Sequence, residues 1–152
     1  MPRIDLEALP CSNATGYPAP FDEAVAGRWW RRIAPAGGLT HMGASHVSLE
    51  PGAWSSQRHW HDDEDELLVM LSGEAVLIED EARTVLRAGD VCAWAAGVTN
   101  GHHLVNEGDV PCTFIAVSAG NAKGSGAYSD IDMKWSGGVY TRKDGTPYPA
   151  KA

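Results

Sequence analysis

Two histidines, His59 and His61, are separated by a single residue and stand just ahead of a run of carboxylates over residues 62–66. In a β-strand, side chains two residues apart point to the same face, so these two rings point together if the stretch is extended. Glu66 follows a short acidic turn and can approach the same point from a neighbouring strand. A later histidine, at His102 or His103, completes a set of nitrogen and oxygen ligands for a transition metal. The spacing therefore favours a metal site built on β-strands.

Short apolar or alternating segments, separated by turns that contain glycine, fill the chain from residue 44 onward. This pattern predicts strands at residues 45–50, 55–61, 66–71, 75–78, 83–87, 91–95, 102–106 and 112–119. About eight short strands without βαβ units or an internal repeat predict an all-β sandwich or barrel.

The two flanks of this region differ from it. Prolines interrupt residues 1–40, so that we expect irregular chain there, with a short helix or an edge strand over residues 21–33. The tail is rich in glycine, serine and aspartate but carries Tyr128, Trp135, Tyr140 and Tyr148. We expect the tail to wrap around the barrel and dock through these rings, since a disordered linker would have few bulky side chains.

A length of 152 residues fits one domain. We therefore expect a single domain over residues 1–152, with an N-terminal arm at 1–43, a core barrel at about 44–119 and a C-terminal tail at 120–152.

Charge and composition exclude some classes of partner. The net charge is −8, and residues 51–110 hold twelve acidic side chains against three basic ones. A nucleic-acid surface needs a basic stripe, so we expect no nucleic acid as partner. No apolar run approaches the ~20 residues that span a bilayer, and the first nine residues lack the apolar segment of a secretory signal. The three cysteines are odd in number and widely spaced, which indicates free thiols in the cytoplasm.

An aromatic and basic cluster stands upstream of the predicted barrel. Trp29, Trp30 and Ile33 are flanked by three arginines, at 28, 31 and 32. An exposed apolar patch of this kind is normally covered. We expect a homodimer in which a second copy covers it.

Two motifs resemble those of the cupin superfamily. The first runs from Gly52 through six residues to His59-x-His61, then four residues to Glu66 and six more to Gly73. The family usually has five residues before the first histidine, so one is extra here.

The second motif runs from Gly89 to Ala95-Ala96-Gly97 and then, after a loop, to His102 and Asn106. Alanine stands at 95 where the family has proline, and four residues rather than two separate Gly97 from the histidine.

The resemblance implies a jelly-roll β-barrel that holds one divalent metal ion (Fe, Mn, Ni, Zn or Cu) through three histidines and one glutamate. Carried over position by position, the ligands are His59, His61, Glu66 and His102. Further segments are similar to the small bacterial cupins described as sugar-phosphate-isomerase-like; they are Gly16-Tyr17-Pro18, Trp54-Ser55-Ser56, Asn100-Gly101-His102-His103 and Asp144-Gly145-Thr146-Pro147-Tyr148.

Two alternatives for the ligands stay open. Asp65 rivals Glu66, because alternation turns only one of this pair inward, and the interval to Gly73 favours Glu66. His103 rivals His102, and the interval to Asn106 favours His102. On a strand, the other histidine of the pair points away, as a surface or interface residue.

The resemblance and the ligand set predict a metal-dependent enzyme acting on a small polar metabolite, by oxygenase or by isomerase or lyase chemistry. The alternative is a cupin that binds or senses a small ligand without catalysis. No catalytic base is evident; Glu64, His103 and Tyr128 are the candidates to test. Five residues are candidates for lining the barrel mouth: Trp54, Gln57, Met70, Trp94 and Phe114.

Overall fold

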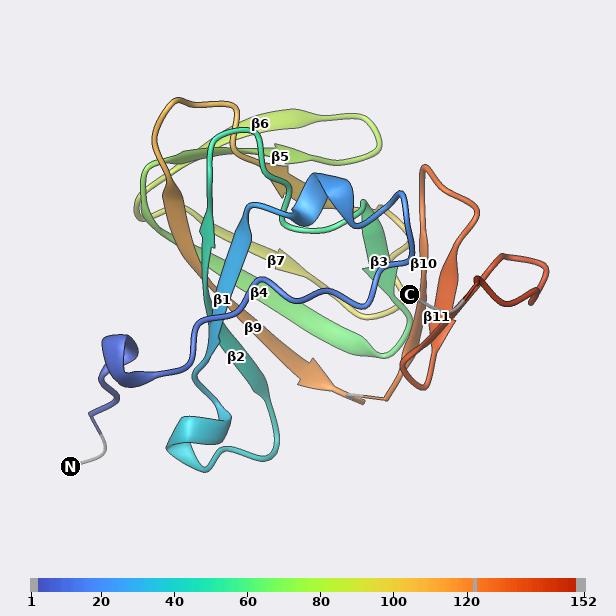
Figure 1. Cartoon of the computed structure of the whole chain (residues 1–152), viewed down its shortest axis with the longest axis horizontal. Coiled ribbons are helices and arrows are strands. Elements are labelled where there is room, and N and C mark those ends of the chain that lie inside the picture. Colours follow the sequence, from blue (N-terminus) through green and yellow to red (C-terminus); the bar gives the residue numbers. More distant parts are fainter. Residues whose placement is uncertain (1–2, 122, 150–152) are drawn as a thin grey trace.

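An antiparallel sheet of five strands crosses the centre of the molecule and forms one wall of a barrel (Figure 1). The structure is a computed structural model, and it describes residues 3–121 and 123–149. In the order of the sheet, the strands are β1 (Arg28–Arg32), β2 (Gly43–Leu49), β9 (Cys112–Gly120), β4 (Glu64–Ser72) and β7 (Val91–Trp94). Along β4, Leu68 and Met70 are buried while Leu67 and Leu71 are exposed. This alternation is that of a sheet with one face on the core.

Two smaller sheets complete the barrel. One has the order β6 (Arg83–Arg87), β5 (Glu74–Ile78) and β8 (His103–Val105). The other has the order β12 (Val139–Thr141), β11 (Lys134–Ser136), β10 (Ser125–Tyr128) and β3 (His59–His61). Isolated bridges connect the two, at Trp54 with Val105 and at His59 with His102. The helical content described is three short 3-10 turns, η1 (Leu6–Ala8), η2 (Glu23–Val25) and η3 (Pro35–Gly37).

The main core lies between the central sheet and the strands β5, β6 and β8. Leu49, Met70, Leu104 and Cys112 are fully buried there. Cys112 and the half-buried Cys92 are free thiols packed with this core, and burial raises the pKa of both. The cysteines here act as small apolar residues.

All eight predicted strands between residues 45 and 119 are present, but three, those predicted at 55–61, 91–95 and 102–106, are shorter than predicted. Of the segment 55–61, only His59–His61 is a strand. The backbone before it makes irregular bonds instead, from Ser55 N–H to the Leu104 carbonyl at 2.8 Å and from Ser129 N–H to the Arg58 carbonyl at 2.9 Å. The turn after β4 needs glycine, because Gly73 has a φ of 69° and a Cβ there would meet that of Cys112 at 2.8 Å.

Residues 21–33 form the short turn η2 followed by β1, at the edge of the central sheet. The edge-strand prediction is thus confirmed. Strand alternation turns Trp30 toward the core while Trp29 stays 36% exposed. The prediction that both tryptophans share one apolar patch is therefore wrong. Ser12 also exchanges two backbone hydrogen bonds with Trp30, so the N-terminal arm covers part of this edge.

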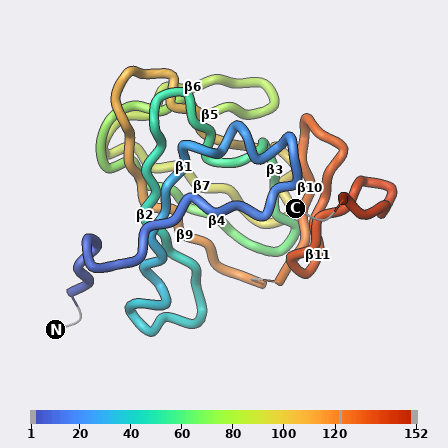
Figure 2. Tube along the Cα trace, in the orientation of Figure 1, coloured from blue at the N-terminus to red at the C-terminus, as the bar shows by residue number. Residues whose placement is uncertain are grey.

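The C-terminal tail docks onto the barrel through its aromatic rings, as predicted. Its strand β10 pairs antiparallel with β3, which places Tyr128 opposite His59. Tyr128 and Met133 of the tail form a second buried cluster with Tyr17 and Val25 of the N-terminal arm. Figure 2 traces this tail, at the red end of the chain, alongside β3. No helix among the described residues is long and apolar enough to cross a membrane.

Candidate metal centre

The strand β3 presents two imidazole rings to the same side. His59 Nε2 lies 3.1 Å from His61 Nε2, and the ring centroids are 4.9 Å apart. Each ring also contacts the indole of Trp135, at 5.7 Å for His59 and 5.1 Å for His61. The prediction that extended chain makes these two histidines point together is confirmed.

The strand β4 brings a carboxylate to the same point. Glu66 Oε2 lies 3.3 Å from His61 Nε2 and 2.7 Å from His102 Nε2. Asp65 is exposed, and its Oδ1 accepts a hydrogen bond from the Ala96 N–H at 2.8 Å. Of the two adjacent carboxylates, the structure therefore directs Glu66 to the histidines and Asp65 to the outer loop.

His102 arrives through a bridge rather than through a regular strand. Its backbone exchanges two hydrogen bonds with His59, at 2.9 and 3.2 Å. Its ring stacks on Trp94, with centroids 3.9 Å apart and planes 7° from parallel. His102 Nδ1 is buried and has no hydrogen-bond partner among the described residues, so that polar atoms approach this ring only at Nε2.

His103 points to the other side, as predicted, but it is not on the surface. Only 3% of the residue is exposed. Its Nδ1 lies 2.9 Å from the Ser56 carbonyl oxygen, and its ring meets Trp54 edge-on at 4.5 Å. The surface or interface interpretation of His103 is therefore wrong, because the segment around Trp54 packs over this side of the strand.

The cluster fits a metal ion geometrically. One ligand atom from each of His59, His61 and Glu66 can be chosen so that all lie within 4.8 Å of one another. Two ligands at about 2.1 Å from an ion and at right angles to each other lie about 3.0 Å apart. The separations here, 3.1, 3.3 and 2.7 Å, bracket that value. His102 contacts this group through its hydrogen bond with Glu66, so that the four predicted ligands lie together. That these four residues hold a metal stays a prediction.

Neighbouring groups orient the two histidines of β3. His59 Nδ1 lies 2.9 Å from the Gln57 carbonyl oxygen, which accepts its N–H and leaves Nε2 free to bind an ion. His61 Nδ1 lies 3.2 Å from Glu64 Oε2. A carboxylate behind a ligating imidazole fixes the ring and makes it a stronger donor.

The ionisation of the cluster follows from burial and from its internal hydrogen bonds. Burial lowers the pKa of His59 to about 4. Burial also acts to lower the pKa of His61, but the hydrogen bonds to Glu64 and Glu66 outweigh it and raise that pKa to about 9. Burial acts to raise the pKa of Glu66, and the hydrogen bonds from His102 and His61 instead hold it well below its usual range.

Metal binding is therefore expected to strengthen as the pH rises toward 9. In the metal-free protein His61 is protonated below its raised pKa of about 9, and an ion can bind its Nε2 only after that proton leaves. One displaced proton gives an affinity that rises about tenfold per pH unit below that pKa and levels off above it. Calorimetric titrations with Mn²⁺ at pH 6, 7 and 8 measure this slope. An affinity that is flat over this range would contradict the prediction.

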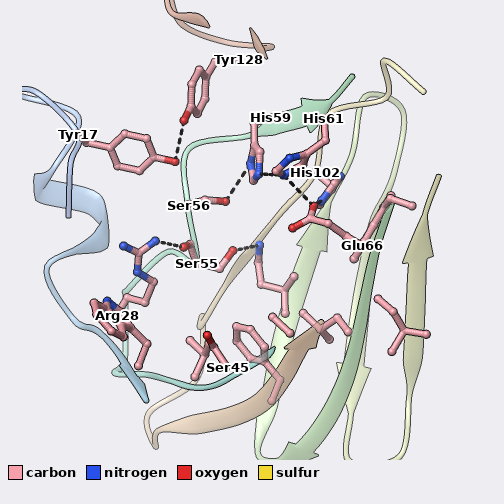
Figure 3. A pocket seen from close by; sticks show the side chains of 18 of the residues that line it. Tyr17, Arg28, Ser45, Ser55, Ser56, His59, His61, Glu66, His102 and Tyr128 are labelled. Carbon is pink, nitrogen blue, oxygen red and sulfur yellow. Dashed lines mark hydrogen bonds and ion pairs between the residues drawn. The ribbon is translucent and has the colours of Figure 1, made fainter. Parts of the chain in front are cut away.

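A cavity of about 440 Å³ opens beside the cluster. Figure 3 shows the histidines and Glu66 on one side of it and Tyr17 and Arg28 on the other, with Ser56 next to His59. The polar lining residues are Tyr17, Arg28, Arg32, Ser45, Ser55, Ser56, His59, His61, Glu66, His102, Tyr128 and Tyr140; the apolar and indole ones are Trp30, Val47, Leu67, Leu68, Trp94, Leu104, Phe114, Ala116 and Trp135.

The lining confirms only part of the sequence prediction. Trp94 and Phe114 border the cavity, as predicted, whereas Trp54, Gln57 and Met70 do not. Residues outside 44–119 also line it, and of these the sequence pointed only to Tyr128, as a candidate base. For Arg28 a signal was available, since alternation on a strand puts it on the same side as Trp30.

The family model described as "Cupin domain" matches residues 45–118. A sugar phosphate isomerase from a cupin superfamily, from Silicibacter pomeroyi, is 38% identical, with a TM-score of 0.92 over 98% of each chain. No curated protein matches this sequence.

Two further solved structures are similar in fold. A protein provisionally assigned as a sugar phosphate isomerase, from Acidithiobacillus ferrooxidans, is 22% identical, with a TM-score of 0.68 over 76% of each chain. A predicted oxalate decarboxylase from Thermotoga maritima is 25% identical, with a TM-score of 0.53 over 61% of this chain and 80% of that one.

Proposed function

This chain belongs to the cupin superfamily, and we propose that it is a metal-dependent enzyme that isomerises a small polar metabolite of the sugar phosphate class. The observation that carries the proposal is the convergence of His59, His61 and Glu66 on one cavity. Because cupin folds host many activities, the fold alone does not choose among them. The name of the Silicibacter pomeroyi relative, sugar phosphate isomerase, supports isomerisation.

We propose that His59, His61, Glu66 and His102 hold one divalent transition metal ion. When bound, such an ion supplies Lewis acidity toward neighbouring oxygen atoms of a substrate. The chain itself shapes the space around it. Trp94 lies flat against His102 and Trp135 meets His61 edge-on, so that indole rings border the cluster and limit the water around it.

Isomerisation also needs groups that hold or move a proton. Of the three candidates named from the sequence, only Tyr128 lines the cavity, since Glu64 contacts His61 and His103 packs under Trp54. The Tyr128 hydroxyl donates to the Tyr17 hydroxyl at 3.2 Å, and burial raises the pKa of both phenols, that of Tyr17 to about 12. Both stay protonated at neutral pH, and we assign this pair as a hydrogen-bond donor to a substrate oxygen rather than as the base.

The proposal is tested on protein purified without added metal. Elemental analysis is expected to find about one equivalent of a divalent transition metal. Incubation with aldose and ketose phosphates in D2O, followed by NMR, is expected to show interconversion with deuterium entering at carbon and no uptake of O2. Uptake of O2 would instead indicate an oxygenase, and binding of sugar phosphates without any exchange would indicate a binding protein; either result overturns the proposal.

We also propose that the protein is a homodimer in the cytoplasm. Of the two tryptophans on the edge strand, only one now supports this interface. Trp29 remains exposed on the edge strand β1, and its indole N–H donates to Glu50 at 3.2 Å. Light scattering at micromolar concentration decides this point, and a monomer would refute it.

A further inference from the structure

Arg28 reaches into the same cavity as the histidine cluster, from the edge strand β1 (Figure 3). Its Nη1 donates to the Ser55 carbonyl oxygen at 2.7 Å. Its Nε is buried and lacks a hydrogen-bond partner among the described residues. A guanidinium has five N–H donors, so that a single bond to a carbonyl leaves most of its capacity unused.

No carboxylate of the described residues balances this charge. Within residues 3–121 and 123–149, none of the ion pairs involves Arg28. Burial lowers the pKa of its guanidinium, and the groups around it are the phenols of Tyr17, Tyr140 and Tyr128. Phenols are neutral at pH 7. A half-buried cation without a counter-charge is costly unless an anion joins it.

The neighbouring arginine on the strand provides a contrast. Arg31 also has a buried Nε without a partner, but its Nη2 lies 3.4 Å from Glu7 Oε2, and it does not line the cavity. Arg31 thus has its counter-charge within the chain. Arg28 differs from it in facing the cavity and in lacking a carboxylate.

Apart from the histidines, the charged residues that line the cavity are two arginines and one glutamate. Although the chain carries a net charge of −8, Glu66 is the one carboxylate among the lining residues, and it is engaged by the histidines. Arg28 and Arg32 line the cavity as well, and Arg32 lies over the Trp30 ring at 5.1 Å. Hydroxyl groups of Ser45 and Ser55 border the same space. The end away from the histidines is therefore built for an oxyanion.

We infer that Arg28 binds an anionic group of the substrate, a phosphate or a carboxylate, while the oxygen atoms that react lie at the histidine cluster. This deepens the proposed function and rests on it for the placement of the reacting atoms. The substrate class is then a small hydroxy-carbonyl compound with a terminal oxyanion, and a cavity of about 440 Å³ lies in the range of small-molecule sites. A purely structural role explains the bond to Ser55 but not the uncompensated charge.

The test is calorimetric titration of the full chain with inorganic phosphate, and separately with glycolate as a carboxylate probe. Both are run on metal-free and metal-loaded protein. Arg28→Gln is expected to weaken the binding of the preferred anion at least tenfold, and the matched control Arg31→Gln to leave it within twofold. Metal content is expected to stay unchanged in both variants.

Arg28→Lys is the control for misfolding, because Arg28→Gln also loses the bond to Ser55. The lysine variant keeps the charge without the planar fork, so that its affinity is expected between those of the wild type and Arg28→Gln. Absence of binding for both anions, or binding that Arg28→Gln leaves unchanged, overturns the inference. Titrations on metal-free protein report on this anion site even if isomerisation is not found. A failure of the inference about Arg28 can therefore be distinguished from a failure of the proposed isomerase function.

Discussion

Replacing Glu66 with glutamine is expected to lower the metal affinity of this protein by more than about 100-fold. Loss of a partner behind a metal ligand costs about 10–100-fold, and loss of the ligand itself costs more. The amide keeps the shape of the side chain but removes the negative charge that faces His61 and His102, at 3.3 and 2.7 Å. Metal content after dialysis and calorimetric affinity for Mn²⁺ measure the effect, and any isomerase activity is expected to fall with it.

The adjacent carboxylate provides the matched control. Asp65→Asn removes a charge one residue away, at an exposed site that accepts a hydrogen bond from the Ala96 N–H. It is expected to leave metal content unchanged. If Asp65→Asn loses the metal and Glu66→Gln retains it, the ligand assignment is reversed. If both retain it, neither carboxylate binds the ion.

The sequence was sufficient to predict the barrel and the convergence of its polar residues. Alternation on β3 and β4 depends on local chain geometry, so that the common facing of His59 and His61 could be derived from spacing. Alternation could not choose between the adjacent carboxylates Asp65 and Glu66, and only the motif interval to Gly73 favoured Glu66. Leu68 and Met70, buried on the same strand, resolve the choice, since they share a face with Glu66.

Residues of the N-terminal arm and the C-terminal tail that line the cavity were harder to predict from the sequence. Tyr17 and Tyr140 lie far apart in sequence, and their rings come within 5.5 Å only because arm and tail form one cluster. Such a contact depends on tertiary packing and leaves no periodic signal. The burial of His103 has the same origin, since strand alternation turns the ring away from His102 but does not indicate that Trp54 covers it.

Replacing Asn106 with alanine is expected to lower the free energy of unfolding by about 3–5 kcal/mol. The residue is completely buried. Its Nδ2 donates to the carbonyl oxygens of Leu49 and Val110, at 2.9 and 2.8 Å, and its Oδ1 accepts from the Gly108 N–H at 3.0 Å. Alanine would remove all three bonds. An unpaired buried group such as the Leu49 carbonyl costs about 1–3 kcal/mol, and each lost bond to the exposed residues Gly108 and Val110 costs about 0.5–1.5 kcal/mol.

Urea unfolding followed by tryptophan fluorescence measures the loss. The matched control is Asn13→Ala, at an exposed site where the side chain makes one long bond, 3.4 Å, to the Ala26 carbonyl. It is expected to change the stability by less than about 0.5 kcal/mol. The prediction is refuted if Asn106→Ala costs less than about 1 kcal/mol. Since typical domains are stable by about 5–15 kcal/mol, the expected loss would make Asn106 a principal support of the turn between β8 and β9, close to the metal-binding histidines proposed here.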